Sequence, residues 1–346
     1  LPPTFVNGFH DEDCVRKMEY LPFGKTGLKV SKISFGGGTL CKFYGDLEEK
    51  IGIDAIHFAL KKGINYFDSA PYYGQGRSEE IYGKAFKTVP RKSFYIATKV
   101  GRYELDLEKM FDFSAQKTRE SVEKSLKLLQ VDYIDVIQIH DVEFAPNLDI
   151  VLNETLPTLE KLRAEGKVKF IGISAYPVSI LKEAISRAPG RFDTVLCYAR
   201  NTLIDDTLRD YLQFFQKNQL GIISASSHGL GLLTNAGCQV WHPCQQQTKD
   251  VCAKAAEICK QNGFELGKLA MYYSLNAMPG PATYLTGMQT TELVKINLDA
   301  YYNGLTAKEQ EIMEVLQKTV FPKIINKHWE NIEVERYWAK MKKISK

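Results

Sequence analysis

The stretch "GINYFDSAPYYGQGRSEEIYG", residues 63–83, contains one complete strand-to-helix unit. Its apolar beginning predicts a buried strand over 64–70, and the later residues have the spacing of an amphipathic helix. The glycines at 74 and 76 suggest a phosphate-binding loop, but Arg77-Ser78-Glu79 follow them, and the third glycine of the dinucleotide-binding fingerprint is missing. We therefore expect these glycines to turn the chain into the helix, and Asp68 and Tyr73 to carry the chemistry.

The same unit recurs along the chain. Strands are predicted at 32–39, 64–70, 93–101, 133–141, 168–175, 193–199, 221–227 and 282–288. Helices are predicted at 48–62, 77–87, 115–130, 151–166, 178–188, 207–218, 248–262, 265–276 and 290–302. Several strands are apolar over consecutive residues, as strands buried on both faces should be. The fold class is therefore α/β, and eight such units favour a (β/α)8 TIM barrel. A doubly wound open sheet is the alternative, although it normally has fewer strands.

The two ends of the chain lie outside these units. Residues 18–33 read as two short strands around a turn, and this hairpin could close the bottom of a barrel. Its "GKT" is not a phosphate loop, because Glu19 stands where the first glycine should be. We divide the chain into an N-terminal extension (1–17), a barrel (18–304) and a C-terminal helical extension (305–346). The last part could cover the side of the barrel, cover its mouth or support a dimer.

Composition excludes several classes of protein. A net charge of +4 without a basic face gives no support to nucleic-acid binding. Seven cysteines without a CxxC pair argue against a zinc site or a disulfide framework and favour a reduced, cytoplasmic location. No apolar run reaches the roughly 18 residues of a membrane span, and the N-terminus lacks the pattern of a signal peptide. We expect no metal, and a monomer or homodimer.

Titratable side chains gather at the C-terminal ends of the predicted strands, where barrels of this type carry their active sites. They are Asp68, Tyr73, Lys99 and His140. A buried Lys99 needs a counter-ion, which Asp68 can provide. The ammonium would lower the pKa of Tyr73, and reaching neutrality from about 10 requires about 3 units, or roughly 4 kcal/mol. Such a tyrosine could exchange a proton with an alcohol or a carbonyl oxygen, while redox chemistry would need a nicotinamide.

Several motifs together resemble the aldo-keto reductase superfamily from about residue 18 to 302. They are "GxNxFDSAxxYG", "IATKVG", "IDVIQIHD" and "FIGIS". The segments "GRY" (101–103), "FDFSAQ" (111–116), "HDVEF" (140–144), "ISAS" (223–226), "GLLT" (231–234) and "WHP" (241–243) resemble its L-galactose dehydrogenase branch. The resemblance implies a (β/α)8 barrel and a catalytic tetrad of Asp68, Tyr73, Lys99 and His140. In it, Tyr73 is the general acid or base, Lys99 and Asp68 tune it, and His140 orients the substrate oxygen or relays the proton.

The resemblance also implies an extended nicotinamide cofactor bound without a Rossmann loop. Its contacts are expected from Gly37, Gly38, Asp68, Ser174, Ser226, His228, Gly229, Gly287, Met288, Thr290, Thr291 and Asn297. NAD is favoured over NADP, because Gly287 and Leu293 occupy the positions where a cation would hold the 2′-phosphate, and Lys295 is out of register. The family's stacking tyrosine aligns with Ala225, so the residue that stacks on the nicotinamide cannot be named.

Four aromatic residues are predicted to rim the mouth and bind the apolar face of a substrate: Tyr103, Phe111, Phe113 and Trp241. The "WHP" and "FDFSA" segments favour an aldose similar to L-galactose, oxidised at its C1 hydroxyl. The alternatives are an NADPH-dependent reductase of ketones or aldehydes, such as steroids, terpenoids or xenobiotics, and a catalytically weak barrel subunit.

Overall fold

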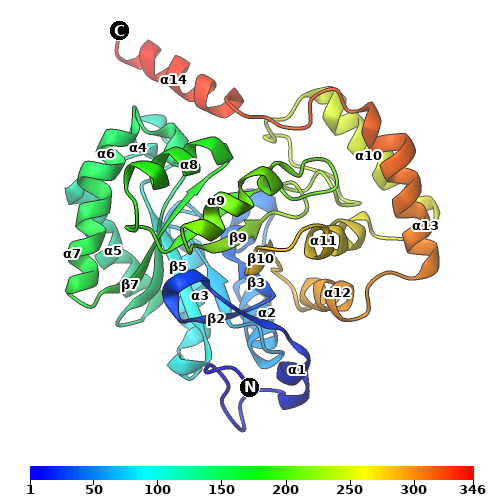
Figure 1. Cartoon of the computed structure of the whole chain (residues 1–346), viewed down its shortest axis with the longest axis horizontal. Helices are drawn as coiled ribbons and strands as arrows, with labels where there is room; N and C mark the ends of the chain where they lie inside the picture. The colour runs from blue at the N-terminus through cyan, green and yellow to red at the C-terminus, as the bar shows by residue number, and fades with distance from the viewer.

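In the computed structural model, which describes residues 1–346, eight parallel strands close into a barrel in the order β10-β3-β4-β5-β6-β7-β8-β9 (Figure 1). The (β/α)8 prediction is confirmed. The strands are β3 (Ile33–Gly36), β4 (Tyr66–Asp68), β5 (Tyr95–Val100), β6 (Ile134–Ile139), β7 (Val168–Ala175), β8 (Thr194–Tyr198), β9 (Gly221–Ala225) and β10 (Thr283–Gly287). Each lies within one or two residues of the predicted segments, except that β3 ends early in a 3-10 turn at 37–39.

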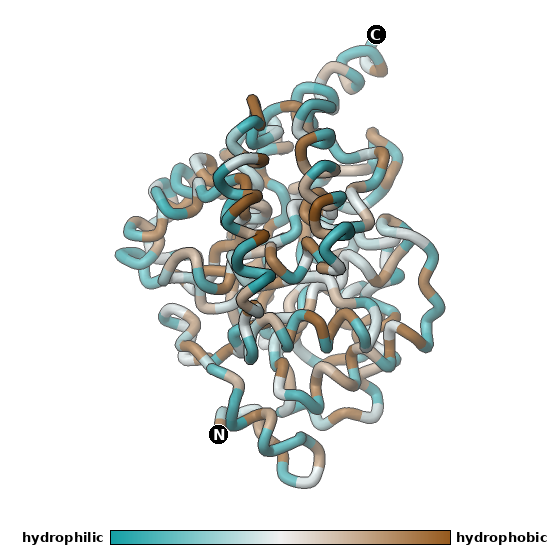
Figure 2. The backbone as a smooth tube through the Cα atoms, turned by 90° about the vertical axis from the view of Figure 1, so that its right-hand side faces the viewer, coloured by the Kyte–Doolittle hydropathy of each residue, from teal (hydrophilic) through white to brown (hydrophobic).

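Helices cover the outside of this barrel. The main ones are α2 (Glu49–Lys61), α3 (Arg77–Phe86), α5 (Ala115–Leu129), α7 (Leu156–Ala164), α8 (Val178–Arg187), α9 (Leu212–Lys217), α10 (Gln246–Gln261), α11 (Leu266–Ala277) and α12 (Thr291–Tyr302). Short α1 (Glu12–Lys17) precedes the first strand, and short α4 (Leu107–Met110) and α6 (Leu148–Ile150) lie in connections between strands and helices. Hydrophilic and hydrophobic residues alternate along the helices (Figure 2), so each presents an apolar stripe to the strands.

Two predicted helices are broken in the structure. The segment 148–164 contains a π-helical turn, Val151–Thr155, between α6 and α7. Pro157 stands in the first turn of α7, and its missing N–H prevents a regular α-helical hydrogen bond there. The predicted helix 207–218 begins as a 3-10 turn, Thr207–Tyr211, before α9. Neither break changes the order of the elements.

The pleat of each strand decides which side chains enter the barrel, because successive residues point to opposite faces. On β5, Ile96 and Val100 belong to the large core beneath the helices, while Ala97 belongs to a smaller core inside the barrel. Lys99, two residues after Ala97, therefore points inward. The same alternation directs Asp68 inward after Tyr66 and carries the inward face of β6 from Val136 to His140.

An N-terminal hairpin closes the bottom of the barrel. Strands β1 (Tyr20–Pro22) and β2 (Lys29–Ser31) pair antiparallel, and a 3-10 turn, Gly24–Thr26, joins them. Phe23 is fully buried and meets the ring of Tyr66 edge-on at 5.5 Å between centroids. The hairpin thus leaves access to the barrel from the opposite end.

The C-terminal extension continues from the barrel through α13 (Ala307–Val315), a π-helical turn (Leu316–Val320) and α14 (Ile332–Ile344). α14 lies above the barrel, at the end opposite the N-terminus (Figure 1). α14 packs against α4 and the turn 142–144, so it covers the mouth. α13 and the turns that follow it pack with α10 and α11 beside the barrel. The extension thus combines two of the three placements left open above. None of the helices combines the length and apolar character needed to cross a membrane.

Candidate active site

A buried ion pair forms the base of the site. The Lys99 ammonium lies 2.6 Å from Oδ1 of Asp68, and each side chain is 2% exposed. The other carboxylate oxygen of Asp68 accepts a hydrogen bond from Nε2 of Gln138 at 2.9 Å. Burial alone would lower the pKa of Lys99, but the neighbouring Asp68 and Tyr73 raise it above its ordinary value, so the lysine stays charged.

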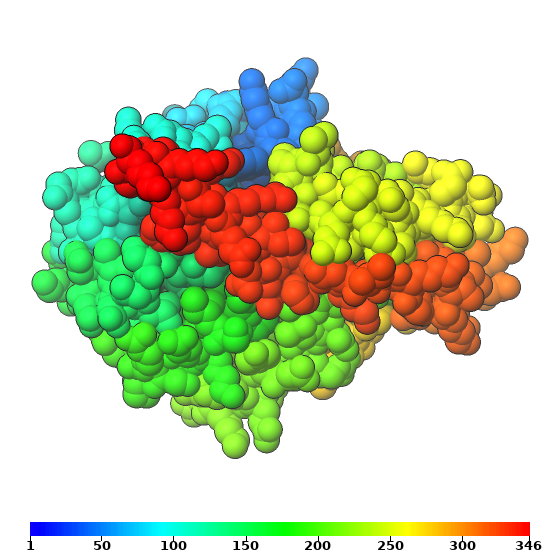
Figure 3. All heavy atoms as spheres, turned by 90° about the horizontal axis from the view of Figure 1, so that it is seen from above, coloured from blue at the N-terminus to red at the C-terminus, as the bar shows by residue number.

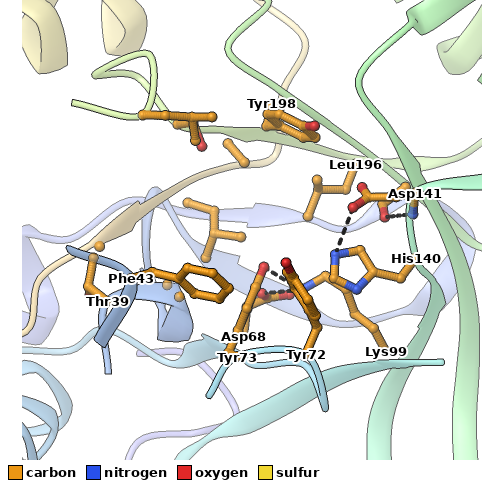
Figure 4. Close-up of a pocket in the computed structure, with 18 of the residues that line it drawn as sticks. Thr39, Phe43, Asp68, Tyr72, Tyr73, Lys99, His140, Asp141, Leu196 and Tyr198 are labelled. Atoms are coloured by element: carbon orange, nitrogen blue, oxygen red, sulfur yellow. Dashed lines mark hydrogen bonds and ion pairs between the residues drawn. The ribbon is translucent and has the colours of Figure 1, made fainter. Parts of the chain in front are cut away.

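The hydrogen bonds of Lys99 determine where the proton of Tyr73 can point. The ammonium has three N–H groups, which face Oδ1 of Asp68, the carbonyl oxygen of Ser69 at 2.8 Å and the phenol oxygen of Tyr73 at 3.2 Å. An ammonium only donates, so the phenol oxygen must accept. The phenol proton is therefore free for a substrate oxygen. Tyr72 and Tyr73 both line the site (Figure 4).

The acidity expected for Tyr73 is not found in this structure. Burial raises the pKa of the Tyr73 phenol, and the opposing effect of Lys99 does not offset it. Asp68 contributes to the difference, because its negative charge also disfavours a phenolate. The prediction counted the ammonium and neglected its counter-ion and the loss of solvent. Tyr73 is thus a protonated phenol at neutral pH, which suits it to act as a general acid.

His140 follows β6 and faces Tyr73 edge-on, with ring centroids 5.9 Å apart. Burial lowers its pKa to about 3, so the imidazole is neutral. Its Nε2 lies 3.4 Å from Oδ2 of Asp141, which also accepts a hydrogen bond from Nη1 of Arg102 at 2.7 Å. Burial alone would raise the pKa of Asp141, but His140 and Arg102 lower it. The charged carboxylate can therefore hold the imidazole ring in place.

These groups open into one cavity of about 330 Å³, which we call the mouth cavity. Asp68, Tyr73, Lys99 and His140 all line it. Leu196 and Tyr198 lie across from Tyr73 and form an opposite wall (Figure 4). The remaining lining residues include Phe43, Tyr44, Tyr72, Arg102, Asp141, Ala225, Leu230, Leu285, Thr286 and Glu333.

The predicted cofactor residues divide into two groups. Gly38, Asp68, Ser174, Ser226 and Gly287 line the mouth cavity. The others do not line it: Gly37, His228, Gly229, Met288, Thr290, Thr291 and Asn297. Gly37 lies beneath the site, where a Cβ atom would come within 2.5 Å of the carbonyl oxygen of Asp68. This glycine therefore allows the loop after β3 to pack against β4.

Several residues of the second group are held by the fold itself. His228 contacts the carbonyl oxygen of Gly267 through Nε2 at 2.9 Å and Thr286 Oγ1 through Nδ1 at 3.3 Å. Both ring nitrogens thus have protein partners, which leaves little for a phosphate. Asn297 donates from Nδ2 to the carbonyl oxygen of Leu293 at 3.0 Å within α12. Met288 is fully buried in the core beneath the helices.

Of the four predicted rim aromatics, only Trp241 lines the mouth cavity, and it is 45% exposed. The loop after β5 folds back on itself, with a bridge between Arg102 and Phe111, and this turns the other three away. The Tyr103 hydroxyl accepts a hydrogen bond from the amide of Gly101 at 2.9 Å. Phe113 is 2% exposed in the outer core. Phe111 stacks on Phe144 at 4.6 Å.

Sequence reasoning missed three charged residues of the cavity: Arg102, Asp141 and Glu333. The positions of Arg102 and Asp141 could have identified them, because each lies within three residues of a tetrad member near the C-terminal end of a strand. The position of Glu333 gave no such indication, because this residue lies in α14, some 29 residues beyond the predicted barrel boundary at 304.

Comparison with known proteins gives a consistent result. The model of the Aldo/keto reductase family matches residues 32–318. An L-galactose dehydrogenase of Arabidopsis thaliana is 40% identical over 287 residues, covering 82% of this chain and 88% of the relative. A D-arabinose 1-dehydrogenase of Saccharomyces cerevisiae is 32% identical over 319 residues, covering 87% and 93%. The holo form of an aldo-keto reductase from Bacillus halodurans superposes with a TM-score of 0.68 at 27% identity, covering 86% and 96%.

Proposed function

Since the chain belongs to the aldo/keto reductase family and is an oxidoreductase acting on CH–OH or carbonyl groups, we propose that it oxidises the C1 hydroxyl of an aldose. The product is the corresponding lactone, and L-galactose is the first sugar to test. Support comes from the two relatives above, which are both named for the oxidation of aldoses.

The observation that carries the chemistry is the arrangement of donors around Lys99. Because its three N–H groups are occupied, Tyr73 presents its own proton or, once deprotonated, its lone pair to the reacting oxygen. In oxidation Tyr73 takes the proton from the C1 hydroxyl, and in reduction it returns it. Since burial raises the pKa of Tyr73, we expect the oxidative rate to increase toward alkaline pH.

The residues present fit a nicotinamide cofactor, which when bound would supply or accept the hydride that no side chain can carry. The hydroxyl group of Thr39, which lines the mouth cavity, and that of Ser227, which follows the lining residue Ser226, are buried and have no hydrogen-bond partner in the protein, so each has a hydrogen bond left for a polar ligand to complete. Thr290 caps α12 by accepting from the amide of Leu293, which leaves the first amides of this helix free as hydrogen-bond donors.

We propose NAD rather than NADP as this cofactor. The first turn of α12 carries Glu292, whose charge opposes a 2′-phosphate and suits a ribose hydroxyl. Lys295 does not compensate, because its ammonium lies over the ring of Phe58 at 5.6 Å. A 2′-phosphate would thus lack the cation that normally holds it.

The lining of the mouth cavity suits a sugar, with aromatic rings from Phe43, Tyr72 and Trp241 beside polar groups from the tetrad. A second candidate, reduction of ketones or aldehydes with NADPH, is favoured by the apolar patch of Leu196, Leu230 and Leu285. A catalytically weak subunit is the third, and the complete tetrad argues against it.

Initial rates for a panel of aldoses and simple carbonyls, each with NAD(H) and NADP(H), separate these candidates. We expect the highest rate with an aldose and NAD. Tyr73→Phe is the control, since it should bind NADH as the unmodified protein does, measured by fluorescence quenching, and turn over about 100-fold more slowly or worse. Retained turnover would remove Tyr73 from proton transfer, and absence of NADH binding in the unmodified protein would favour the subunit.

We propose the cytoplasm as the place of action, supported by the seven free cysteines. Monomer and homodimer remain alternatives that light scattering distinguishes.

A further inference from the structure

The last part of the chain, which we call the C-terminal segment (319–346), lies beyond the residues matched by the family model, which end at 318. It nevertheless contributes one side chain, Glu333, to the mouth cavity. Seen from above, the segment crosses the top face of the molecule between the parts of the chain coloured green and yellow (Figure 3). The chain runs through residues 321–331 to reach α14, and Glu333 stands in the first turn of that helix.

The segment is held on the N-terminal side of Glu333 by Trp329 and Glu330. The indole of Trp329 stacks on the ring of Tyr176 with centroids 4.6 Å apart and an interplanar angle of 9°. The amide of Trp329 also donates to the Tyr176 hydroxyl at 3.2 Å. Glu330 forms an ion pair with Arg200, which is 2% exposed. These contacts fix the chain three to four residues before Glu333.

A second attachment lies one helical turn after Glu333. Tyr337 is 7% exposed and meets the rings of Phe111 and Phe144 edge-on, at 5.2 and 5.8 Å between centroids. Residues four apart share a helix face, so Tyr337 directs Glu333 toward the barrel. Glu333 is thus fixed from both sides above the mouth.

The carboxylate of Glu333 has no partner of its own. It is partly buried and makes no hydrogen bond or ion pair with another side chain, although it lines the same cavity as Tyr73 and Lys99. The cavity is lined by two cations, each already paired: Lys99 with Asp68, and Arg102 with Asp141. Glu333 is the remaining carboxylate of the cavity lining. Burial raises its pKa, and the charge of Arg102 opposes that shift. In its ionised form it gives the cavity an unbalanced negative charge and two free acceptor oxygens.

We propose that Glu333 is a specificity-determining residue, which accepts hydrogen bonds from substrate hydroxyls remote from the reacting carbon and excludes substrates that carry a negative charge there. The inference rests on the proposed function, because it takes the substrate to be a polyhydroxylated sugar. A site that hydrogen-bonds a hydroxyl discriminates strongly against analogues lacking it. A like charge near an unpaired carboxylate is strongly disfavoured.

The test compares Glu333→Gln with Glu335→Gln. The first keeps the size of the side chain and removes its charge, and the second makes the same change at an exposed position of the same helix. Three substrates are used with each: L-galactose, the hexuronic acid with a carboxylate in place of its terminal hydroxymethyl group, and benzaldehyde in the reductive direction. NADH quenching and thermal unfolding show that both variants are folded and bind cofactor.

For Glu333→Gln we expect KM for L-galactose to rise about tenfold with little change in kcat. We expect kcat/KM for the hexuronic acid to rise at least tenfold, and benzaldehyde reduction to remain unchanged. Glu335→Gln should behave as the unmodified protein. If L-galactose is oxidised with equal KM by all three proteins and the hexuronic acid stays excluded, this inference is overturned and the proposed function stands. If the unmodified protein oxidises no aldose, both are overturned.

Discussion

Replacing Lys99 with Met tests whether the buried ion pair with Asp68 contributes both to the stability of the fold and to turnover. The change keeps the length of the side chain but removes the cation beside Asp68, which is 1% exposed and would keep only the hydrogen bond from Gln138. Breaking a buried pair on one side costs about 3–5 kcal/mol. We therefore expect the free energy of unfolding to fall by about 4 kcal/mol and the melting temperature by roughly 10 °C.

The double variant Lys99→Met/Asp68→Asn provides the matched control. It removes both charges, so most of the lost stability should return, while turnover should stay low because Tyr73 has lost its partner. Urea unfolding and initial rates of aldose oxidation measure the two effects separately. A loss of less than 1 kcal/mol in the single variant, with no recovery in the double one, would refute the buried pair. Undiminished turnover would refute the assignment of Lys99.

Two further predictions concern His140 and the C-terminal helix. Because burial lowers the pKa of His140 from 6.5 to about 3, the unfolded chain takes up a proton between these values and the folded one does not, so stability falls as pH falls. Between pH 7 and pH 5, the free energy of unfolding of His140→Gln, measured with urea, should therefore fall by about 2 kcal/mol less than that of the unmodified protein. An equal fall in both proteins would contradict a buried neutral imidazole. Tyr337→Ala should loosen α14 from Phe111 and Phe144, so proteolysis after residue 330 should accelerate at least tenfold while the melting temperature changes by less than about 2 °C. Unchanged proteolysis would show that other contacts hold the helix.

The barrel and three of the tetrad residues, Asp68, Lys99 and His140, could be predicted because they follow from strand periodicity, whereas Tyr73 lies in the turn after β4 and was predicted from its place just beyond a strand end. A strand buried on two faces is recognisable as an apolar run, and the two-residue repeat fixes which side chains point inward. Lys99 follows Ala97 on β5, and His140 continues the inward face of β6, so both had to enter the barrel. Their meeting with Asp68 follows from the closure of parallel strands.

Loop residues could not be predicted in the same way. Tyr103 and Phe113 lie under their loop because it folds back through backbone contacts between Arg102 and Phe111. No periodicity records such a turn. The acidity of Tyr73 also depends on a balance between burial, Lys99 and Asp68, and a sequence names these groups without giving their separation. Glu333 enters the site through tertiary packing of α14, far along the chain.

The placement of α14 puts the proton-transfer residues and the cover over them in different parts of the chain, whereas many enzymes build both from one set of loops. The residues to which we assign proton transfer lie between positions 68 and 140, whereas the cover over them comes from the last 28 residues and is held mainly by aromatic contacts. Exchanging only this terminal portion between related chains would alter which molecules are admitted and leave the reaction itself intact. Diversification of such enzymes can thus proceed by replacing an end of the polypeptide, without disturbing the strands.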